Sequence, residues 1–198
     1  HHGRSCQVDE KKGELPFLRI ETYNGSGLSS LKTRLLCTFA AIVLGQETGI
    51  TEEKTESMTA WSIAKGWRYI HTPAIPCAGG KTSAGAAIFV RATIGLRYLF
   101  AEEGGSTVPA VNRVIQGVIA AGGLPPLAIT SACFYSGEGA GKRNLTLLAS
   151  IGNSRSNHRL CLIGADWNMV PAELNGTGFV ARSGMAVRFS KAATCVRR

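Results

Sequence analysis

The chain has 198 residues, 44% of them hydrophobic, and 24 glycines; this composition predicts a globular, strand-rich protein and excludes a disordered one. The formal net charge is +9. From Gly105 onward, ten lysines or arginines stand against only three acidic residues, Glu138, Asp166 and Glu173. So basic a half predicts a polyanionic partner, most simply nucleic acid, with an ordinary basic surface as the alternative.

The six cysteines show neither a C-x-x-C pair nor the ligand spacing of a zinc site. Cys133 and Cys161 lie in apolar runs, where a reduced cysteine behaves as a small core residue. No segment approaches the ~20 apolar residues of a membrane span, and no signal peptide is recognised. We expect an intracellular location, with the nucleus as one candidate, and no membrane partner. Because the chain begins with His1 and not with methionine, we expect it to be part of a longer reading frame.

Hydrophobic periodicity predicts the elements of the first half in chain order. Residues 1–15 are expected to form a loose leader. A strand over Pro16–Tyr23 then runs into a tight turn at Asn24–Gly27. The next elements are a helix with Leu28, Leu31, Leu35 and Leu36 on one face, a buried strand over Ala40–Leu44 that ends near Glu47, and a helix over Thr51–Lys65. A strand over Trp67–Ile70, a loop over Pro73–Ser83, and strands over Gly85–Arg91 and Leu96–Phe100 follow.

In the second half, two long β-favouring runs, Val108–Ala120 and Leu127–Tyr135, predict an antiparallel pair. A helix over Asn144–Gly152 precedes a short buried strand over Leu160–Ile163, and a last strand is expected over Gly178–Phe189. Strand–helix–strand units are mixed with adjacent strands. The predicted fold class is therefore α/β (α+β), with helices flanking two packed sheets.

Two glycine-rich segments look like phosphate-binding loops but lack the required pattern. In Gly80-Lys81-Thr82 and in Gly137–Lys142, the first glycine of G-x-x-x-x-G-K-[ST] is replaced by Ile75 and Ser136. The isolated His71 and His158 are interpreted as surface or strand-end residues, and no nucleophile signature is present.

Five polar residues stand at the ends of predicted strands: Asn24, Glu47, Tyr135, Asp166 and Asn168. If these strands lie side by side, the polar residues converge at one rim. Glu47 would then offer a hard oxygen ligand for Mg²⁺. Asp166 would hold or deprotonate a water, and the two asparagines would supply amide donors and neutral oxygens. Together they predict metal-assisted attack on a phosphodiester, although for Asp166 and Asn168 an Asx turn after a strand is the alternative.

Five segments in this order match the motifs of a known family. Thr22–Leu28 resembles its first strand with the asparagine, Val43–Thr48 its LQET metal motif, Ser83–Val90 its GGVAILV strand, Ser131–Tyr135 its tyrosine strand and Ile163–Asn168 its GGDFN motif. The family is the endonuclease/exonuclease/phosphatase superfamily. It includes apurinic/apyrimidinic endonucleases, deoxyribonuclease I, retrotransposon endonuclease domains, neutral sphingomyelinases and inositol-polyphosphate phosphatases.

The resemblance implies a four-layer sandwich of two mainly antiparallel sheets flanked by helices, in a domain over residues 16–198. It also implies that Glu47 binds Mg²⁺, or Mn²⁺ in its place, with Asn24 supporting the metal site. Tyr135 would lie near the scissile phosphate, Asp166 would orient or activate the attacking water, and Asn168 would contact the phosphate. DNA is the expected partner, and the oligomeric state is not predicted.

One departure from the family concerns its C-terminal motifs. The family continues with a Ser-x-Ile-Asp strand and an Asp-His pair, whereas the four histidines of this chain, His1, His2, His71 and His158, all precede Asp166. We therefore expect a domain whose last strands are missing, and its activity is open. The alternatives are a catalytically dead remnant that binds nucleic acid through a basic surface, and a phosphodiesterase or phosphatase for lipid or inositol phosphates.

Overall fold

The computed structural model describes residues 18–25, 27–99, 112–120, 125–153 and 160–179. Four α-helices lie in this part of the chain: α1 (Leu28–Cys37), α2 (Thr55–Ala64), α3 (Lys142–Asn153) and α4 (Pro171–Gly176). The strands of the first half are β1 (Ile20–Asn24), β2 (Ile42–Gln46), β3 (Trp67–Thr72), β4 (Ile75–Pro76), β5 (Thr82–Ser83), β6 (Ala86–Arg91) and β7 (Gly95–Tyr98). Three further strands are β8 (Val114–Ala120), β9 (Leu127–Cys133) and β10 (Cys161–Asp166).

The strands form two four-stranded sheets, with the orders β1-β2-β6-β3 and β10-β9-β8-β7, and one small ribbon of β4 and β5. Within each large sheet one pair is parallel, β1 with β2 and β9 with β10. The other pairs in these two sheets are antiparallel. The two large sheets are therefore mainly antiparallel, as the sequence predicts.

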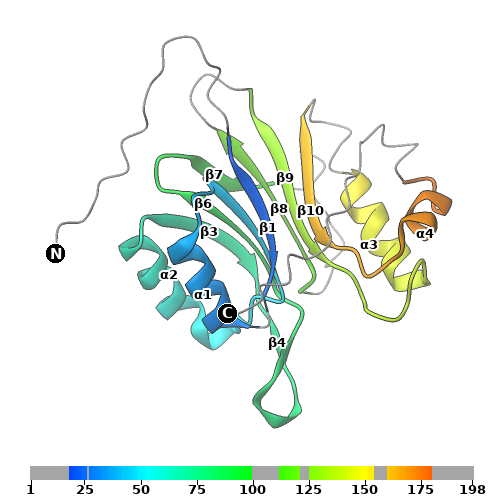
Figure 1. The fold of residues 1–198 in the computed structure, drawn as a ribbon, viewed down its shortest axis with the longest axis horizontal. Coiled ribbons are helices and arrows are strands. Elements are labelled where there is room, and N and C mark those ends of the chain that lie inside the picture. The colour runs from blue at the N-terminus through cyan, green and yellow to red at the C-terminus, as the bar shows by residue number, and fades with distance from the viewer. Residues whose placement is uncertain (1–17, 26, 100–111, 121–124, 154–159, 180–198) are drawn as a thin grey trace, which may run out of the picture.

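Three hydrophobic clusters define four layers. Figure 1 shows α1 and α2 on one side of the two sheets and α3 and α4 on the other. The central cluster joins the two sheets, through residues such as Ile42 and Ile88 on one side and Ile129 on the other. A second cluster packs α1 and α2 against the outer face of the first sheet. The third packs α3 and α4 against the outer face of the second sheet. The predicted four-layer arrangement of helix, sheet, sheet and helix is confirmed.

The structure departs from the sequence prediction in the segment expected to be a loop, Pro73–Ser83. Its ends pair as β4 and β5, because Gly79 (φ 72°) and Gly80 (φ 71°) adopt left-handed conformations that let the chain reverse. The resulting hairpin, Ile75–Ser83, projects from the body of the molecule (Figure 1).

Helix α4 was not anticipated. Pro171 occupies its first turn, where its missing N–H costs nothing, and the Glu173 carboxylate accepts a hydrogen bond from the N–H of Val170 (3.0 Å). Its six residues are too few to give a clear helical period.

Strand β10 also differs from the fully buried strand expected over Leu160–Ile163. It continues to Asp166, and of its six residues only Gly164 is buried. The reason is its place at the end of the sheet in the described part of the chain.

Several predictions lie outside the described residues: the leader over 1–15, the start of the strand over Val108–Ala120, and most of the strand over Gly178–Phe189. The domain limits and the missing last strands likewise stay predictions. Among the helices that the structure describes, none has the length and apolar character required to span a membrane.

Candidate functional site

The site lies where the carboxyl ends of four strands meet. In the first sheet, parallel pairing sets Asn24 at the end of β1 beside Gln46 at the end of β2. In the second sheet, Asp166 at the end of β10 lies beside Cys133 at the end of β9. Because the two sheets pack face to face, both pairs come to one rim of the sandwich. Parallel strands carry their carboxyl ends to the same edge, which explains the convergence.

A buried amide connects the two sheets directly behind this rim. The side chain of Gln46 is 2% exposed, and its Nε2 donates to the Ser131 hydroxyl (3.0 Å) and to the Gly164 carbonyl (3.3 Å) of the second sheet. Ser131 in turn donates to the carbonyl of Gly45 (2.8 Å). These bonds fix the distance between the sheets at the point where the site residues emerge.

Asp166 is held by two amide side chains. The Nδ2 of Asn24 donates to Asp166 Oδ2 at 2.6 Å, and the Nδ2 of Asn168 donates to the same oxygen at 3.1 Å. Asn168 also donates to the carbonyl of Phe134 (2.8 Å), so both of its amide hydrogens are engaged. Since both donors use Oδ2, neither of these bonds engages Asp166 Oδ1.

Glu47 follows β2 in a left-handed backbone conformation with φ 50°. This conformation is uncommon for a residue with a side chain, and it turns the carboxylate out of the strand direction. Glu47 is exposed, and among the described residues its carboxylate has no hydrogen-bond or ion-pair partner. Asn168 has a similar backbone conformation, with φ 47°.

Cys133 is a site residue that the sequence interpretation missed. One ligand atom each from Glu47, Cys133 and Asp166 lies within 4.8 Å of the others. The only available signal was its position at the end of a buried strand, two residues before Tyr135. The sequence predicts a core residue at this position, and Cys133 is 0% exposed.

The donor set tests which cation the cluster suits. Glu47 and Asp166 offer carboxylate oxygens, the ligands that Mg²⁺ prefers. Burial raises the pKa of the Cys133 thiol to about 11, and the nearby Glu47 carboxylate adds to the increase. Sulfur is in addition a soft ligand, which suits a hard cation such as Mg²⁺ poorly. The residues present thus fit a divalent cation held by oxygen.

Tyr135 follows Cys133 by two residues, and contacts of its ring and of its backbone hold it in place. Its ring contacts two guanidinium groups, those of Arg113 and Arg143, at 3.9 and 4.0 Å from the ring centroid. Its backbone N–H donates to the buried Asn144 side chain (2.8 Å). Within the described residues, the hydrogen bonds that connect Asn24, Asp166 and Asn168 do not include Tyr135. Its role near a scissile phosphate stays a prediction.

The motifs that failed the sequence criteria have other places in the fold. Gly80-Lys81-Thr82 belongs to the β4–β5 hairpin and not to a turn between a strand and a helix. His71 lies on β3, where its ring hydrogen-bonds the Thr55 hydroxyl (3.2 Å) and burial lowers its pKa.

The structure has two packed, mainly antiparallel sheets with helices outside and polar residues at their common rim. This is the arrangement that the resemblance to the endonuclease/exonuclease/phosphatase superfamily implies. Among solved structures, the chain is similar to the endonuclease domain of TRAS1, a telomere-specific non-LTR retrotransposon. The TM-score is 0.55 and the identity 17%, over 84% of this chain and 70% of that one.

A second similar structure is the AP endonuclease LMAP from Leishmania major. The TM-score is 0.50 and the identity 12%, over 77% of this chain and 60% of that chain. No protein-family model and no curated protein matches the sequence. At these identities the likeness shows the fold alone, and this fold agrees with the one that the resemblance to the superfamily implies.

Proposed function

We propose that this domain is a metal-dependent phosphodiester hydrolase of the endonuclease type, with Mg²⁺ as its cation and DNA as its substrate. The observation that carries the proposal is the arrangement of Asp166 between two amides, with the unpartnered Glu47 carboxylate close by. This arrangement suits hydrolysis with a metal ion. Asp166, which the two amides hold in place, can orient water, while the Glu47 carboxylate holds the cation.

Glu47 would hold the cation, and Asn24 would support it. The Asn24 amide nitrogen donates to Asp166, so its carbonyl oxygen is the atom that can face the metal or a metal-bound water. When bound, Mg²⁺ supplies polarisation of the phosphoryl oxygen and neutralises charge that develops there.

Asp166 would orient the attacking water and accept its proton at Oδ1, the oxygen that neither amide uses. Asn168 would act as a positioning residue, because both of its amide hydrogens are already directed at Phe134 and Asp166. The phosphate contact expected for Asn168 would require one of these bonds to open. Tyr135, between two arginines, would lie near the substrate.

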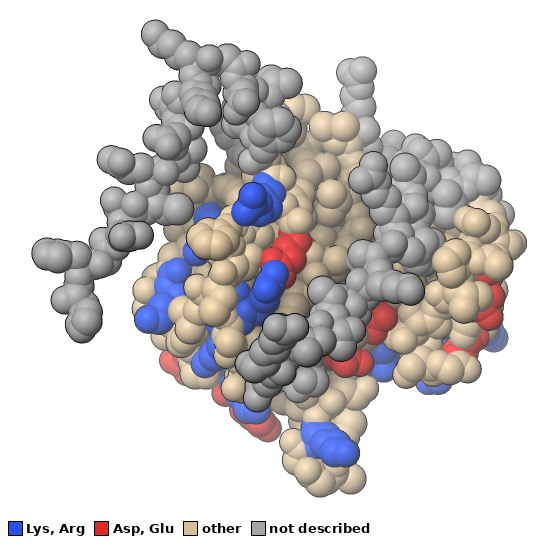
Figure 2. Space-filling model, viewed as in Figure 1, with Lys and Arg blue, Asp and Glu red and all other residues tan. Residues whose placement is uncertain are grey.

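The net charge of +9 supports nucleic acid as the substrate class. In Figure 2, lysine and arginine side chains gather over the part formed by α1 and α2 and also appear on the projecting hairpin. Polyanions are attracted by such a surface, whereas it offers no specific reason to favour a lipid.

The test is nicking of supercoiled plasmid DNA in Mg²⁺ by the wild-type chain and by Asp166→Ala. We expect the variant to lose about a hundredfold to ten-thousandfold in rate, the usual range for a lost general base. Glu56→Ala, which removes an exposed acid on α2, is the matched control and should nick like the wild type. EDTA should abolish the reaction.

Equal nicking by the wild type and Asp166→Ala would contradict the proposal. Binding of DNA without nicking by the wild type would instead favour the alternative of a binding remnant. Circular dichroism of each variant separates loss of chemistry from loss of fold.

A further inference from the structure

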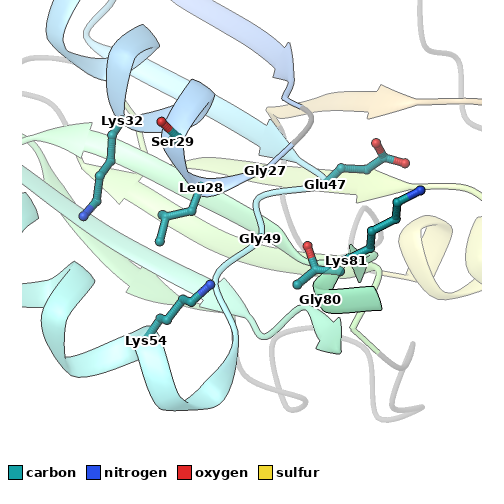
Figure 3. A pocket seen from close by; sticks show the side chains of 10 residues that line it. Gly27, Leu28, Ser29, Lys32, Glu47, Gly49, Lys54, Gly80 and Lys81 are labelled. Carbon is teal, nitrogen blue, oxygen red and sulfur yellow. The ribbon is translucent and has the colours of Figure 1, made fainter. Parts of the chain in front are cut away.

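A groove with a volume of about 820 Å³ has Glu47 in its lining, and none of its described lining residues belongs to β9 or β10. Its walls come from the start of α1, the loop after β2, the turn before α2, and the β4–β5 hairpin. Figure 3 shows these four parts around one opening, with Glu47 and Lys81 extending toward the same side of it.

Three lysines line this groove, each from a different element: Lys32 from α1, Lys54 from the turn before α2, and Lys81 from the hairpin. Glu47 is the one acidic residue of the described lining. Lys54 and Lys81 are exposed, and in the described ranges neither has a hydrogen-bond or ion-pair partner for its ammonium group. Lys32 lies over the ring of Trp61, 5.2 Å from its centroid. Apart from the Glu47 carboxylate, the charged side chains of the groove lining are therefore all positive.

Two glycines keep part of the wall as bare backbone. Gly27 (φ 118°) and Gly49 (φ 65°) both line the groove. A Cβ on Gly49 would lie 2.7 Å from the backbone nitrogen of Leu28, so a side chain does not fit there. The missing side chain at Gly49 therefore lets the loop after β2 pack against the start of α1, whereas at Gly27, where a Cβ would meet nothing within 4 Å, it leaves the wall open.

We propose that this groove binds the phosphates of a nucleic-acid strand that continue from the scissile phosphate, with Lys54 and Lys81 as their principal contacts. The inference rests on the proposed function and adds to it the direction in which the strand leaves the site. Lysines on three separate elements suit a succession of phosphates, whereas a single small phosphate ester needs one anion site only. Lysine is a flexible point charge and contacts phosphate without reading base sequence.

The experiment measures binding of a fluorescein-labelled DNA duplex by anisotropy, in EDTA so that no cleavage occurs, over a range of salt concentrations. The groove variant is Lys54→Glu combined with Lys81→Glu. The matched control is Lys65→Glu combined with Arg68→Glu, which changes the net charge equally at two exposed positions outside the groove lining. Thermal melting checks the fold of both variants.

We expect the groove variant to bind about tenfold or more weakly at low salt, and the slope of log K against log salt to fall by about two, one for each lost phosphate contact. The control should stay closer to the wild type in both measurements. Equal binding by the two variants, or no DNA binding by the wild type, would overturn the inference. If the glutamate pair melts early, Lys54→Ala with Lys81→Ala gives the same slope test without charge reversal.

The two proposals fail in different ways. A wild-type chain that binds DNA through the groove but does not nick it would refute the proposed hydrolase and leave the groove assignment intact. A chain that nicks DNA, with the groove variant and its control binding alike, would refute only the groove.

Discussion

The two carboxylates of the site each lie at the end of a β-α-β unit, and the two units differ in how their last strands are supported. The first unit is β1-α1-β2 and ends with Glu47; the second is β9-α3-β10 and ends with Asp166. In each, the helix packs on the outer face of its sheet, through Leu31 and Leu35 in one unit and through Leu148 and Ile151 in the other.

The units differ in how their final strands are supported. All five residues of β2 are buried, and β2 has a hydrogen-bonded strand on each side. Strand β10 is half-exposed and has one neighbouring strand among the described residues. The acid after the buried strand has no side-chain partner there, whereas the acid on the half-exposed strand is held by two amides.

Packing of a strand and hydrogen bonds to a side chain can therefore both hold a carboxylate of the site in position. A fully packed strand orients its terminal acid without side-chain bonds, which leaves the Glu47 carboxylate free for a cation. Strand β10 is less tightly packed, and hydrogen bonds from two amides hold its terminal acid, Asp166. A carboxylate held in this way suits the task of orienting a water. Three substitutions separate these two kinds of support.

The largest effect is expected for Gln46→Leu. This change removes an amide with acceptors in both sheets, and it leaves Ser131 and the Gly164 carbonyl without that donor. Loss of such a buried network should lower the free energy of unfolding by about 3 kcal/mol. Urea denaturation followed by tryptophan fluorescence measures it.

Thr22→Val is the control, because it removes a single hydrogen bond, the one that the exposed Thr22 hydroxyl donates to the side-chain oxygen Oε1 of Gln46 (3.2 Å). It should cost less than about 1 kcal/mol. A midpoint for Gln46→Leu equal to that of the wild type would mean that the amide does not hold the sheets together.

A smaller effect is expected for Gly164→Ala, on β10. A Cβ at this position would lie 2.5 Å from Leu44 Cδ1 and 3.1 Å from Leu44 Cβ, so the sheets must separate locally. We expect a loss of about 2 kcal/mol, within the usual range for overpacking. Gly176→Ala meets nothing within 4 Å and should leave stability unchanged in the same denaturation; similar losses in both variants would argue against close sheet packing at Gly164.

The smallest effect is expected for Arg34→Ala at the surface of the first unit. Burial raises the pKa of Glu21, but hydrogen bonds from Arg34 and Thr38 outweigh it and hold the pKa below the ordinary 4.5. The folded state thus favours the charged carboxylate, and this stabilisation is present above pH 4.5 and is lost as the pH falls through the lowered value.

The expected cost of Arg34→Ala is less than about 1 kcal/mol at pH 7, because the pair is partly exposed. Denaturation curves at pH 7 and at acid pH measure it, and the difference from the wild type should shrink at acid pH. A difference that grows toward acid pH would contradict the assignment.

The parts of the fold that the sequence predicts are those where one element's own residues carry the signal. Strand β2 begins with three apolar residues and β9 is rich in β-favouring residues, as suits strands that are buried in the middle of a sheet. The β4–β5 hairpin was missed because only two residues of each strand are paired, and α4 because it has six residues. Segments this short show no hydrophobic periodicity. The half-exposed state of β10 depends on which strands neighbour it, which its own residues do not encode.

Among the site residues, too, the sequence predicts those whose own neighbours in the chain carry the signal. Asn24 and Asp166 are 142 residues apart, yet both were predicted, because a polar residue after an apolar strand stands out. Cys133 was missed because a thiol in an apolar run is what an ordinary core also contains. Only the approach of Glu47 and Asp166 from other strands distinguishes it.

The bonds of Gln46 also determine how the protein opens. Because its amide joins carbonyl and hydroxyl groups of both sheets, neither sheet can slide over the other, or detach alone, without breaking buried hydrogen bonds. We therefore expect the backbone amides of β2 and β9 to exchange with solvent in one cooperative event, and not sheet by sheet. Glu47 is the next residue along the chain, so these bonds hold the end of β2 directly beside the site.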